Sequence, residues 1–384
     1  MFLSIIFIFL VFISFININR KNQFGFAYFF ILICLIIICA IRYRVGGDTL
    51  AYYDKFFEYP TVKELFTFNF KEAQYNPSWY IFNAISKSIN DSFYTFQLLH
   101  AIIVNSVIFW FMARYSLNKY FILPFYFFLY FLYFNMEILR EALAVAVFLI
   151  AIPLFLKKSW IKYYLLCCLA LTFHNSALIL FTLPLFSLNL KVSYQIALFV
   201  FSSTIVGFLS TGNFLFSIGI DKLFGSNSLF YLNKEFSVIG TLYQLLKLIP
   251  VFLIFSLAKS KNISSVFEKF IFPYIIIGIC GSFIPGIYRF LNYLSIPILI
   301  YCINILYIFY FKRNIYTLTF LKVQFCVGFL ILFQLHYFFQ DRSELAKIKG
   351  VNRYDLYTPF YTIFDERIHD TRETFFYNQF EGNL

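Results

Sequence analysis

Charged residues and glycines are both scarce in this chain, which excludes most soluble folds. Asp, Glu, Lys and Arg make up 13% of the 384 residues, while apolar residues make up 61%. Uncharged runs of about 18 residues recur, and a helix of that length spans a bilayer. Only 14 glycines stand against 58 phenylalanines, so the helices are bulky rather than packed through small-residue stripes. The sequence therefore predicts an all-α polytopic membrane protein.

The cysteines offer neither a disulfide framework nor a metal site. All seven lie inside apolar runs, at Cys34, Cys39, Cys167, Cys168, Cys280, Cys302 and Cys326. Free cysteines in such runs behave as small, inert hydrophobes. The sequence also lacks a P-loop, a GxGxxG fingerprint and zinc-ligand spacing. We therefore expect no metal and no cofactor.

The net charge of +12 does not indicate nucleic acid binding. The chain has no basic tail and no basic cluster with interleaved aromatic residues. The excess instead occupies short loops between apolar runs, as expected when positive residues stay on the cytoplasmic side of a membrane. The lipid bilayer is thus the first predicted partner.

About twelve membrane-spanning segments are predicted within residues 1–340, which we interpret as one transmembrane domain. The apolar runs are 1–17, 24–41, 93–113, 120–136, 139–156, 161–173, 174–188, 193–210, 242–258, 266–283, 286–311 and 318–339. The first run is not typical of a cleavable signal peptide, because Arg20 and Lys21 follow it instead of preceding it.

The orientation follows from the charges of alternate loops. Those assigned to the cytoplasm contain one acid, Glu268, and the basic residues Arg20, Lys21, Arg114, Lys119, Lys157, Lys158, Lys162, Lys191, Lys259, Lys261, Lys269, Lys312 and Arg313. On the opposite side, in loop 42–92 and tail 341–384, acidic residues match or outnumber basic ones. We therefore predict that both termini, loop 42–92 and loop 211–240 are extracytoplasmic.

One pair of spans depends on this count. Residues 163–186 could form a single helix with His174 at its middle, which would give eleven spans. That alternative would place outside the cell the basic residues Lys191, Lys259, Lys261, Lys269, Lys312 and Arg313, against the charge rule. We therefore predict two short helices, each roughly 20 Å long, that meet at His174 in the outer half of the membrane.

The outer segments are more than simple connectors. Stretches 49–59 and 74–90 of loop 42–92 are aromatic and amphipathic, which is typical of helices that lie at a membrane interface. The tail 341–384 is charged at its start and aromatic beyond, so we expect it to fold back onto the outer face.

The first of four polar constellations is RYRVGGDTLAYY at 42–53. Arg42 and Arg44, beside the turn at Gly47, can present guanidinium forks and backbone N–H groups to an anion. Asp48 follows within a few residues of these cations and should stay ionised. The alternative is lipid anchoring, which is disfavoured because basic anchors collect at the cytoplasmic end of a span.

The second constellation is EILREALA at 137–144. Arg140 lies three residues after Glu137 and directly before Glu141, so one acid can share its helical face. The alternative to a functional role is a structural ion pair, because charges buried in a membrane usually have partners.

The third constellation is FHNSA at 173–177. A lone histidine is more often a satisfied polar residue than a catalyst. His174, however, lies at a helix break that faces the outer polar region, where it could act as a base. His100, His336 and His369 carry weaker signals, the first two as buried hydrogen-bonding groups.

The fourth constellation is PGIYRFLNY at 285–293. Arg289 follows a Pro-Gly break and lies one turn into a long apolar run, with Asn292 and Tyr293 on its helical face. A charge at that depth is costly, and a bound anion is a good explanation for it. Lys247 and Lys322 can extend to an interface, and we assign them no role.

Together these stretches resemble the EpsG-type branch of the Wzy-like O-antigen and exopolysaccharide polymerases. The matching features are GGDTLAYY after the second span, REALA, FHNSAL and YRFLNY, in this order. The resemblance covers most of residues 20–310 and matches loop 211–240 and the tail only in general character.

The resemblance implies an integral glycosyltransferase with a GT-C-like helical bundle in a bacterial cytoplasmic (inner) membrane. Such an enzyme transfers a polyprenyl-pyrophosphate-linked glycan to the non-reducing end of a second lipid-linked repeat unit. A chain-length regulator and a flippase would be its protein partners. The acceptor hydroxyl needs a base, and the candidates on the outer face are Asp48, Glu137, Glu141 and His174, of which we rank His174 first and Asp48 and Glu141 behind it. The remaining expected site residues are Arg140, Arg289, Arg42, Arg44, Gly47, Tyr52, Tyr53, Asn292 and Tyr293.

Two other classes stay open. A flippase or transporter of lipid-linked sugars would use the same arginines, but it should show polar groups through the full membrane depth. A membrane acyltransferase would need a polar site reached from the cytoplasm. The cytoplasmic loops are too short and too uniformly basic for that. A non-enzymatic assembly subunit would leave Arg289 unexplained.

Overall fold

The computed structural model describes residues 2–17, 25–70, 73–187, 193–194, 197, 201, 238–283, 287–311, 317–347, 349–365 and 367–381. Within these ranges the secondary structure is helical, with two isolated β-bridges between Arg42 and Thr362 and between Asp341 and Asn352. The prediction of an all-α fold is confirmed for this part of the chain. Most of the predicted span 193–210 and residues 211–237 of the second predicted outer loop lie outside it.

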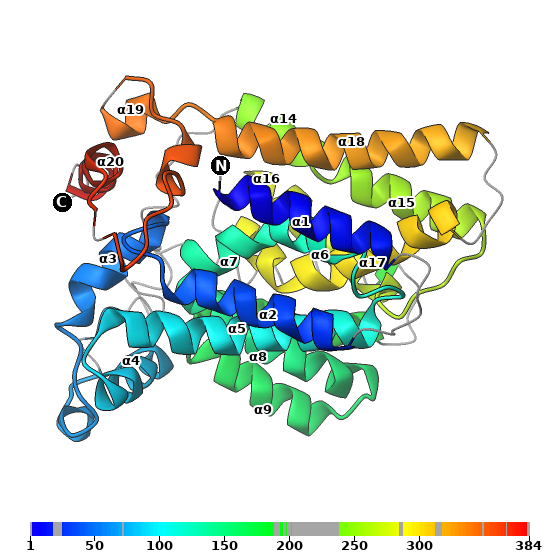
Figure 1. Cartoon of the computed structure of the whole chain (residues 1–384). Coiled ribbons are helices and arrows are strands. Elements are labelled where there is room, and N and C mark those ends of the chain that lie inside the picture. The colour runs from blue at the N-terminus through cyan, green and yellow to red at the C-terminus, as the bar shows by residue number, and fades with distance from the viewer. Residues whose placement is uncertain are drawn as a thin grey trace.

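The bundle is built from apolar helices that run side by side (Figure 1). They are α1 (Phe2–Ile16), α2 (Gly25–Ala40), α5 (Phe93–Tyr115), α6 (Leu123–Tyr126), η2 (Phe127–Phe131), α7 (Leu132–Met136), α8 (Leu139–Leu156), α9 (Trp160–Leu171), η3 (Asn175–Ser187), α14 (Val238–Leu246), α15 (Ile249–Ser260), η4 (Glu268–Phe270), α16 (Ile271–Phe283), η5 (Ile287–Phe290), α17 (Leu291–Phe311) and α18 (Thr317–Phe339).

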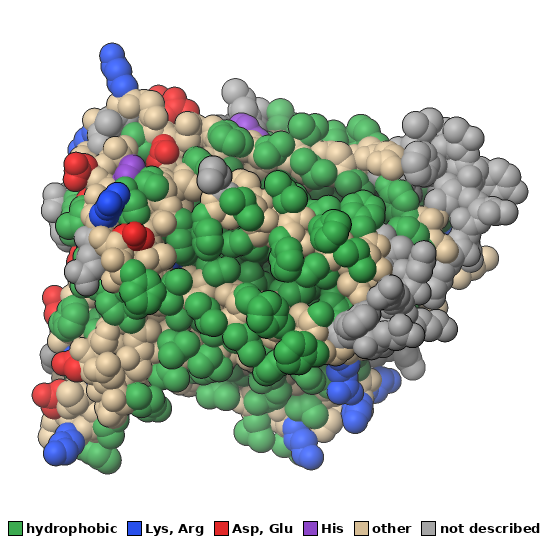
Figure 2. Space-filling view, in the orientation of Figure 1, with side chains coloured by type: hydrophobic (Ala, Val, Ile, Leu, Met, Phe, Trp, Pro, Cys, Tyr) green, Lys and Arg blue, Asp and Glu red, His purple; other side chains and the backbone are tan. Residues whose placement is uncertain are grey.

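Four helical stretches in the described residues are long and apolar enough to cross a membrane: Phe93–Tyr115, Leu139–Leu156, Gly240–Ser260 and Ile287–Phe311. Further apolar helices are shorter. On the face shown in Figure 2, hydrophobic side chains cover the middle of the bundle, whereas charged side chains collect towards its ends. The molecule is thus a helical membrane protein. The count of twelve spans and the GT-C-like arrangement remain predictions.

One end of the bundle carries the smaller helices, and we call it the α3 end (Figure 1). These helices are α3 (Gly47–Phe56), η1 (Glu64–Phe66), α4 (Pro77–Ile89), α19 (Ser343–Ala346), η6 (Arg353–Leu356) and α20 (Asp370–Glu381). Helices α3 and α4 occupy the two stretches of loop 42–92 that were predicted to be helical, and their place at a membrane interface stays a prediction. The tail folds back as expected, because the backbone N–H of Gly46 donates to Leu356 O and that of Tyr43 to Tyr361 O.

The break predicted at His174 is confirmed. Helix α9 ends at Leu171 and η3 begins at Asn175, which contradicts the single-helix alternative for 163–186. Asn76, directly before α4, contacts both sides of this break, since its Nδ2 donates to Asn175 Oδ1 (2.5 Å) and to Leu171 O (3.0 Å). An amide side chain thus satisfies one of the carbonyls that the end of α9 leaves without a helical partner.

Candidate functional site

Polar side chains from three bundle segments meet at the α3 end around one hydroxyl group. Ser176 Oγ, in the first turn of η3, lies 2.6 Å from His174 Nδ1, 3.2 Å from Glu141 Oε1 and 3.0 Å from Tyr293 OH. All four side chains are buried. Ser176 therefore joins the helix break to α8 and to α17, and we call this group with Arg289 and Asn292 the His174 cluster.

Arg289 completes the cluster from η5, directly before α17. Its Nη1 lies 3.5 Å from His174 Nε2, and Asn292 Nδ2 donates to Glu141 Oε1 at 3.1 Å. The second oxygen of Glu141 is buried and has no hydrogen-bond partner. The second, third and fourth constellations of the sequence are thus brought together. Pro285 and Gly286, which were predicted to break the chain before Arg289, lie outside the described residues.

Arg140 adds a second cation beside this cluster. Its Nε donates to Tyr52 OH (2.9 Å), and its guanidinium lies 4.1 Å from the centre of the Tyr75 ring. The ion pair with Glu137 that the sequence spacing permits does not form, because Glu137 pairs with Arg353 of the tail. Aromatic faces hold the Arg140 side chain in position without neutralising it.

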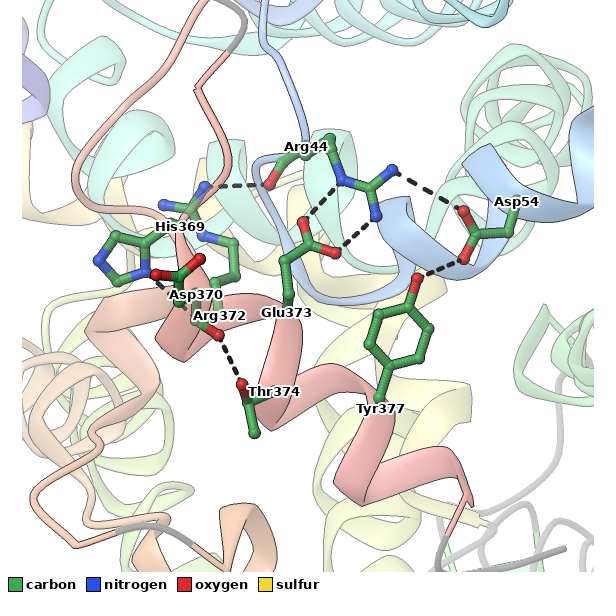
Figure 3. Close-up of polar contacts among 8 residues, drawn as sticks. All are labelled: Arg44, Asp54, His369, Asp370, Arg372, Glu373, Thr374 and Tyr377. Atoms are coloured by element: carbon green, nitrogen blue, oxygen red, sulfur yellow. Dashed lines mark hydrogen bonds and ion pairs between the residues drawn. The ribbon is translucent and has the colours of Figure 1, made fainter.

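Arg44 has different partners from those expected for a pyrophosphate ligand. Its Nε and Nη2 donate to the two carboxylate oxygens of Glu373 in α20, at 2.6 and 2.5 Å, and Asp54 lies 3.8 Å away (Figure 3). The hydrogen bonds from Glu373 raise the pKa of Arg44, so the guanidinium stays charged within a bidentate pair. Its charge is thus already balanced at the junction between α3 and α20.

Arg42 also lies apart from the His174 cluster, but its Nε and Nη2 are buried without a hydrogen-bond partner among the described residues. The side chain is 1% exposed, and its Nη1 donates to Cys39 O (2.5 Å) at the end of α2. Its backbone oxygen accepts from Gln97 of α5. The structure therefore does not bring Arg42 or Arg44 into hydrogen-bonding contact with the His174 cluster, and their predicted role in binding pyrophosphate stays a prediction.

Of the other residues predicted from the first constellation, one lies beside Arg140 and one beside Arg44. Tyr52 reaches the site through Arg140, while the Tyr53 ring lies 5.0 Å beneath the Arg44 guanidinium. Gly47 begins α3, and Asp48 follows it in the first turn. The side chain of Asp48 lies outside the described part of the structure.

Sequence reasoning missed several residues around the site. Ser176 stood within the FHNSA motif, but a serine in an apolar run carries no distinguishing signal. Tyr75 and Tyr133 are hidden by an aromatic content of 24%. Tyr133 OH accepts from Asn292 Nδ2 at 3.4 Å. Among the described residues, no group of three His, Cys, Asp or Glu side chains is placed to hold a metal ion.

A comparison with known protein families identifies the family of this chain. A model of the EpsG family matches residues 25–345, which include all four constellations. The chain belongs to the EpsG family. No curated protein and no solved structure matches it. The EpsG match contains every member of the His174 cluster and ends before η6 and α20, so Arg353 and Glu373 lie outside the matched region.

Proposed function

We propose that this EpsG-family protein is a metal-independent polysaccharide polymerase. It transfers a growing polyprenyl-pyrophosphate-linked glycan to the non-reducing end of a second lipid-linked repeat unit, at the outer face of a bacterial cytoplasmic membrane. The observation that supports this most is the pairing of a base with a cation. His174 Nε2 and Arg289 Nη1 face each other at 3.5 Å, with Arg140 close by.

Each group has a defined part in the reaction. The acceptor hydroxyl gives its proton to the base while its oxygen bonds to the anomeric carbon of the donor. The bond from that carbon to the pyrophosphate breaks, and its electron pair leaves with the pyrophosphate. Arg289 and Arg140 stabilise this departing charge with guanidinium donors, in the way a metal ion otherwise would.

His174 is the base that the geometry favours. If its Nδ1–H donates to Ser176 Oγ and the serine hydroxyl donates to Glu141, Nε2 carries the lone pair that takes the acceptor proton, with Arg289 Nη1 facing it at 3.5 Å. In the other tautomer Nδ1 accepts from the backbone N–H of Ser176 at 3.2 Å. Glu141 then orients the imidazole through Ser176. Asp48 and Glu141 remain the alternative bases. Tyr52, Tyr53, Asn292, Tyr293, Gly47, Arg42 and Arg44 remain the proposed substrate-binding residues.

The first prediction concerns this base. His174→Ala should slow elongation of a purified lipid-linked repeat unit by about 10²–10⁴-fold, because general base catalysis contributes that much. His336 of α18 is exposed, not buried as the sequence suggested, so His336→Ala is the matched control and should elongate normally. Normal elongation by His174→Ala with none by Asp48→Asn would assign the base to Asp48. If the wild type elongates no lipid-linked oligosaccharide, the polymerase proposal fails and the flippase alternative gains.

The second prediction concerns the leaving group. Arg289→Lys keeps the charge but loses the planar fork, so the turnover rate should fall by roughly tenfold or more while the protein stays folded. Lys322→Arg in α18 is a control for the exchange of one cation for the other. An unchanged turnover rate in Arg289→Lys would show that Arg289 does not act on the pyrophosphate.

A further inference from the structure

A second group of cations lies at the α3 end, next to the His174 cluster. We call it the tail cluster: Arg342, Arg353, Lys247, Glu137 and Tyr337. Tyr133 lies between the two clusters, because its hydroxyl accepts from Asn292 on one side and is within electrostatic reach of Glu137 on the other. Nothing in the proposed reaction so far uses these cations.

Within the tail cluster, Arg353 contacts both Glu137 and Tyr337. Its Nη2 pairs with Glu137 Oε2, and its guanidinium lies 4.2 Å from the centre of the Tyr337 ring. Tyr337 OH donates to the same carboxylate at 3.0 Å. The Nε of Arg353 is nevertheless buried without a hydrogen-bond partner. One donor of the fork is therefore unsatisfied, and an oxyanion could accept from it.

Lys247 approaches Arg353 from the bundle. It lies between α14, which ends at Leu246, and α15, which begins two residues after Lys247 at Ile249. Its ammonium is half-buried, 4.5 Å from the centre of the Tyr243 ring and 5.8 Å from that of Tyr288. The Tyr243 ring in turn lies 4.8 Å from that of His336, the residue before Tyr337, so the ammonium lies on the side of the bundle that carries the tail cluster. Among the described residues, no acid forms an ion pair with this lysine.

Arg342 is the third cation, at the start of the tail. Its backbone N–H donates to Val351 O, and the backbone N–H of Arg353 donates to Gln340 O, so the two arginines lie on paired backbone segments. Burial and the charge of Arg353 lower the pKa of Arg342, and Glu137 only partly offsets this. Three half-buried cations therefore lie in this region, and among the described residues only Arg353 forms an ion pair with Glu137. Like charges held together at a membrane surface cost free energy, which a bound anion would recover.

We propose that the tail cluster binds the pyrophosphate of the acceptor lipid. The inference rests on the proposed function, because the reaction joins two pyrophosphate-linked lipids and the His174 cluster accounts only for the one that leaves. Two arginines and a lysine beside the ends of apolar helices offer the donors and the charge that a lipid-borne pyrophosphate requires. The Glu137–Tyr337–Arg353 contacts hold this second site at a fixed position relative to the first.

A binding measurement tests the second site without turnover. Native mass spectrometry of the full chain in detergent, with farnesyl pyrophosphate as the probe, should show two bound molecules on the wild type. The double variant Lys247→Gln/Arg342→Gln should bind one, because it removes two cations and spares the Arg353–Glu137 pair. Lys349→Gln, which removes an exposed charge from the same tail, should bind two. One molecule on the wild type, or two on the double variant, overturns the proposal.

An elongation assay tests whether the pyrophosphate at the tail cluster belongs to the acceptor lipid or to the donor lipid. With a lipid-linked acceptor, the double variant should need an acceptor concentration at least tenfold higher than the wild type for half-maximal rate. With a repeat-unit oligosaccharide that lacks pyrophosphate, the two proteins should elongate equally. Equal loss with both acceptors would assign the cluster to the donor and overturn the proposal. A wild type that binds two probes yet elongates nothing would refute the polymerase function and the acceptor role, but would leave two pyrophosphate sites.

An anionic phospholipid could supply the same chemistry, and a third measurement distinguishes it. In nanodiscs of phosphatidylcholine the wild type should still take up two molecules of farnesyl pyrophosphate, and phosphatidylglycerol in tenfold excess should not displace either of them. Displacement of one molecule on the wild type but none on the double variant would make the tail cluster a phospholipid site and overturn the assignment.

Discussion

At the level of single residues, the loop before α3 packs closely against the end of α7. Gly46 has a φ of +109°, and a Cβ there would lie 2.5 Å from Met136 O. Gly47, next to it, would place a Cβ no closer than 3.8 Å to any neighbour. Thr49 Oγ1 donates to the same Met136 oxygen at 3.1 Å. The approach of the loop before α3 to the end of α7 therefore depends on one glycine of the pair.

The third prediction follows from this asymmetry. Gly46→Ala should destabilise the protein by about 1–3 kcal/mol, because it combines an unfavourable backbone conformation with a steric clash. Gly47→Ala should be close to neutral. Thermal unfolding in detergent, followed by intrinsic fluorescence, compares the two variants. Equal midpoints would show that the loop does not need the glycine conformation at position 46.

Sequence patterns predicted some of these residue environments and not others. The break at His174 was predictable because the charges of distant loops required an additional crossing. The pairing of Arg44 with Glu373 was not, because 329 positions separate the two residues. A local motif of arginines and glycines has the same appearance whether its charges meet a ligand or a distant carboxylate.

At the level of elements, α20 is attached to the loop before α3 by a small set of polar contacts. Arg372 is 1% exposed and donates to three backbone oxygens, those of Arg44 (3.0 Å), Asp355 (3.2 Å) and Pro359 (2.7 Å). Burial lowers the pKa of Arg372 to about 10, which still leaves the guanidinium protonated at neutral pH. Tyr377 OH reaches Asp54 Oδ2 at 3.3 Å. Figure 3 shows the contacts of Arg372 and Glu373 with Arg44 and that of Tyr377 with Asp54.

The fourth prediction tests this attachment. Glu373→Gln removes the charge of a largely buried bidentate pair and should weaken the docking of α20 by about 1.4 kcal/mol, within the range measured for coupled side chains. Protease cleavage within 349–381 should then be about tenfold faster, since it follows the population of the undocked form. Glu344→Gln changes an exposed acid of the same tail and serves as the control. Cleavage at the wild-type rate would mean that Arg44 does not hold α20.

At the level of the whole molecule, the direction of the helices agrees with the pattern predicted from loop charges. Phe2, at the start of α1, stacks on Phe360 of the tail at 5.0 Å, so α1 begins at the α3 end. The helices α2 and α18 both end there as well (Figure 1). Apolar periodicity and charge segregation are properties of whole segments, and they therefore predicted the bundle better than its contacts.

The fifth prediction assigns a side of the membrane to each end. Single cysteines at Thr67 and Lys349 should react with an impermeant thiol reagent added outside cells, because loop 42–92 and the tail are predicted outside. Cysteines at Lys158 and Asn262 should react only after permeabilisation. The protein with its seven native cysteines alone gives the background. Labelling of position 158 in intact cells would invert the topology and contradict the proposed outer site.

The docking of the tail also has a practical consequence for experiments on this protein. Topology is often mapped by cutting a chain after successive spans and attaching a reporter. A cut anywhere between residues 346 and 372 would remove Glu373 and leave Arg44 with a half-exposed Asp54 as its nearest acid. Arg353 would be lost with cuts before that residue, leaving Glu137 beside the proposed site without its cation. Reporters inserted into an intact chain avoid both changes.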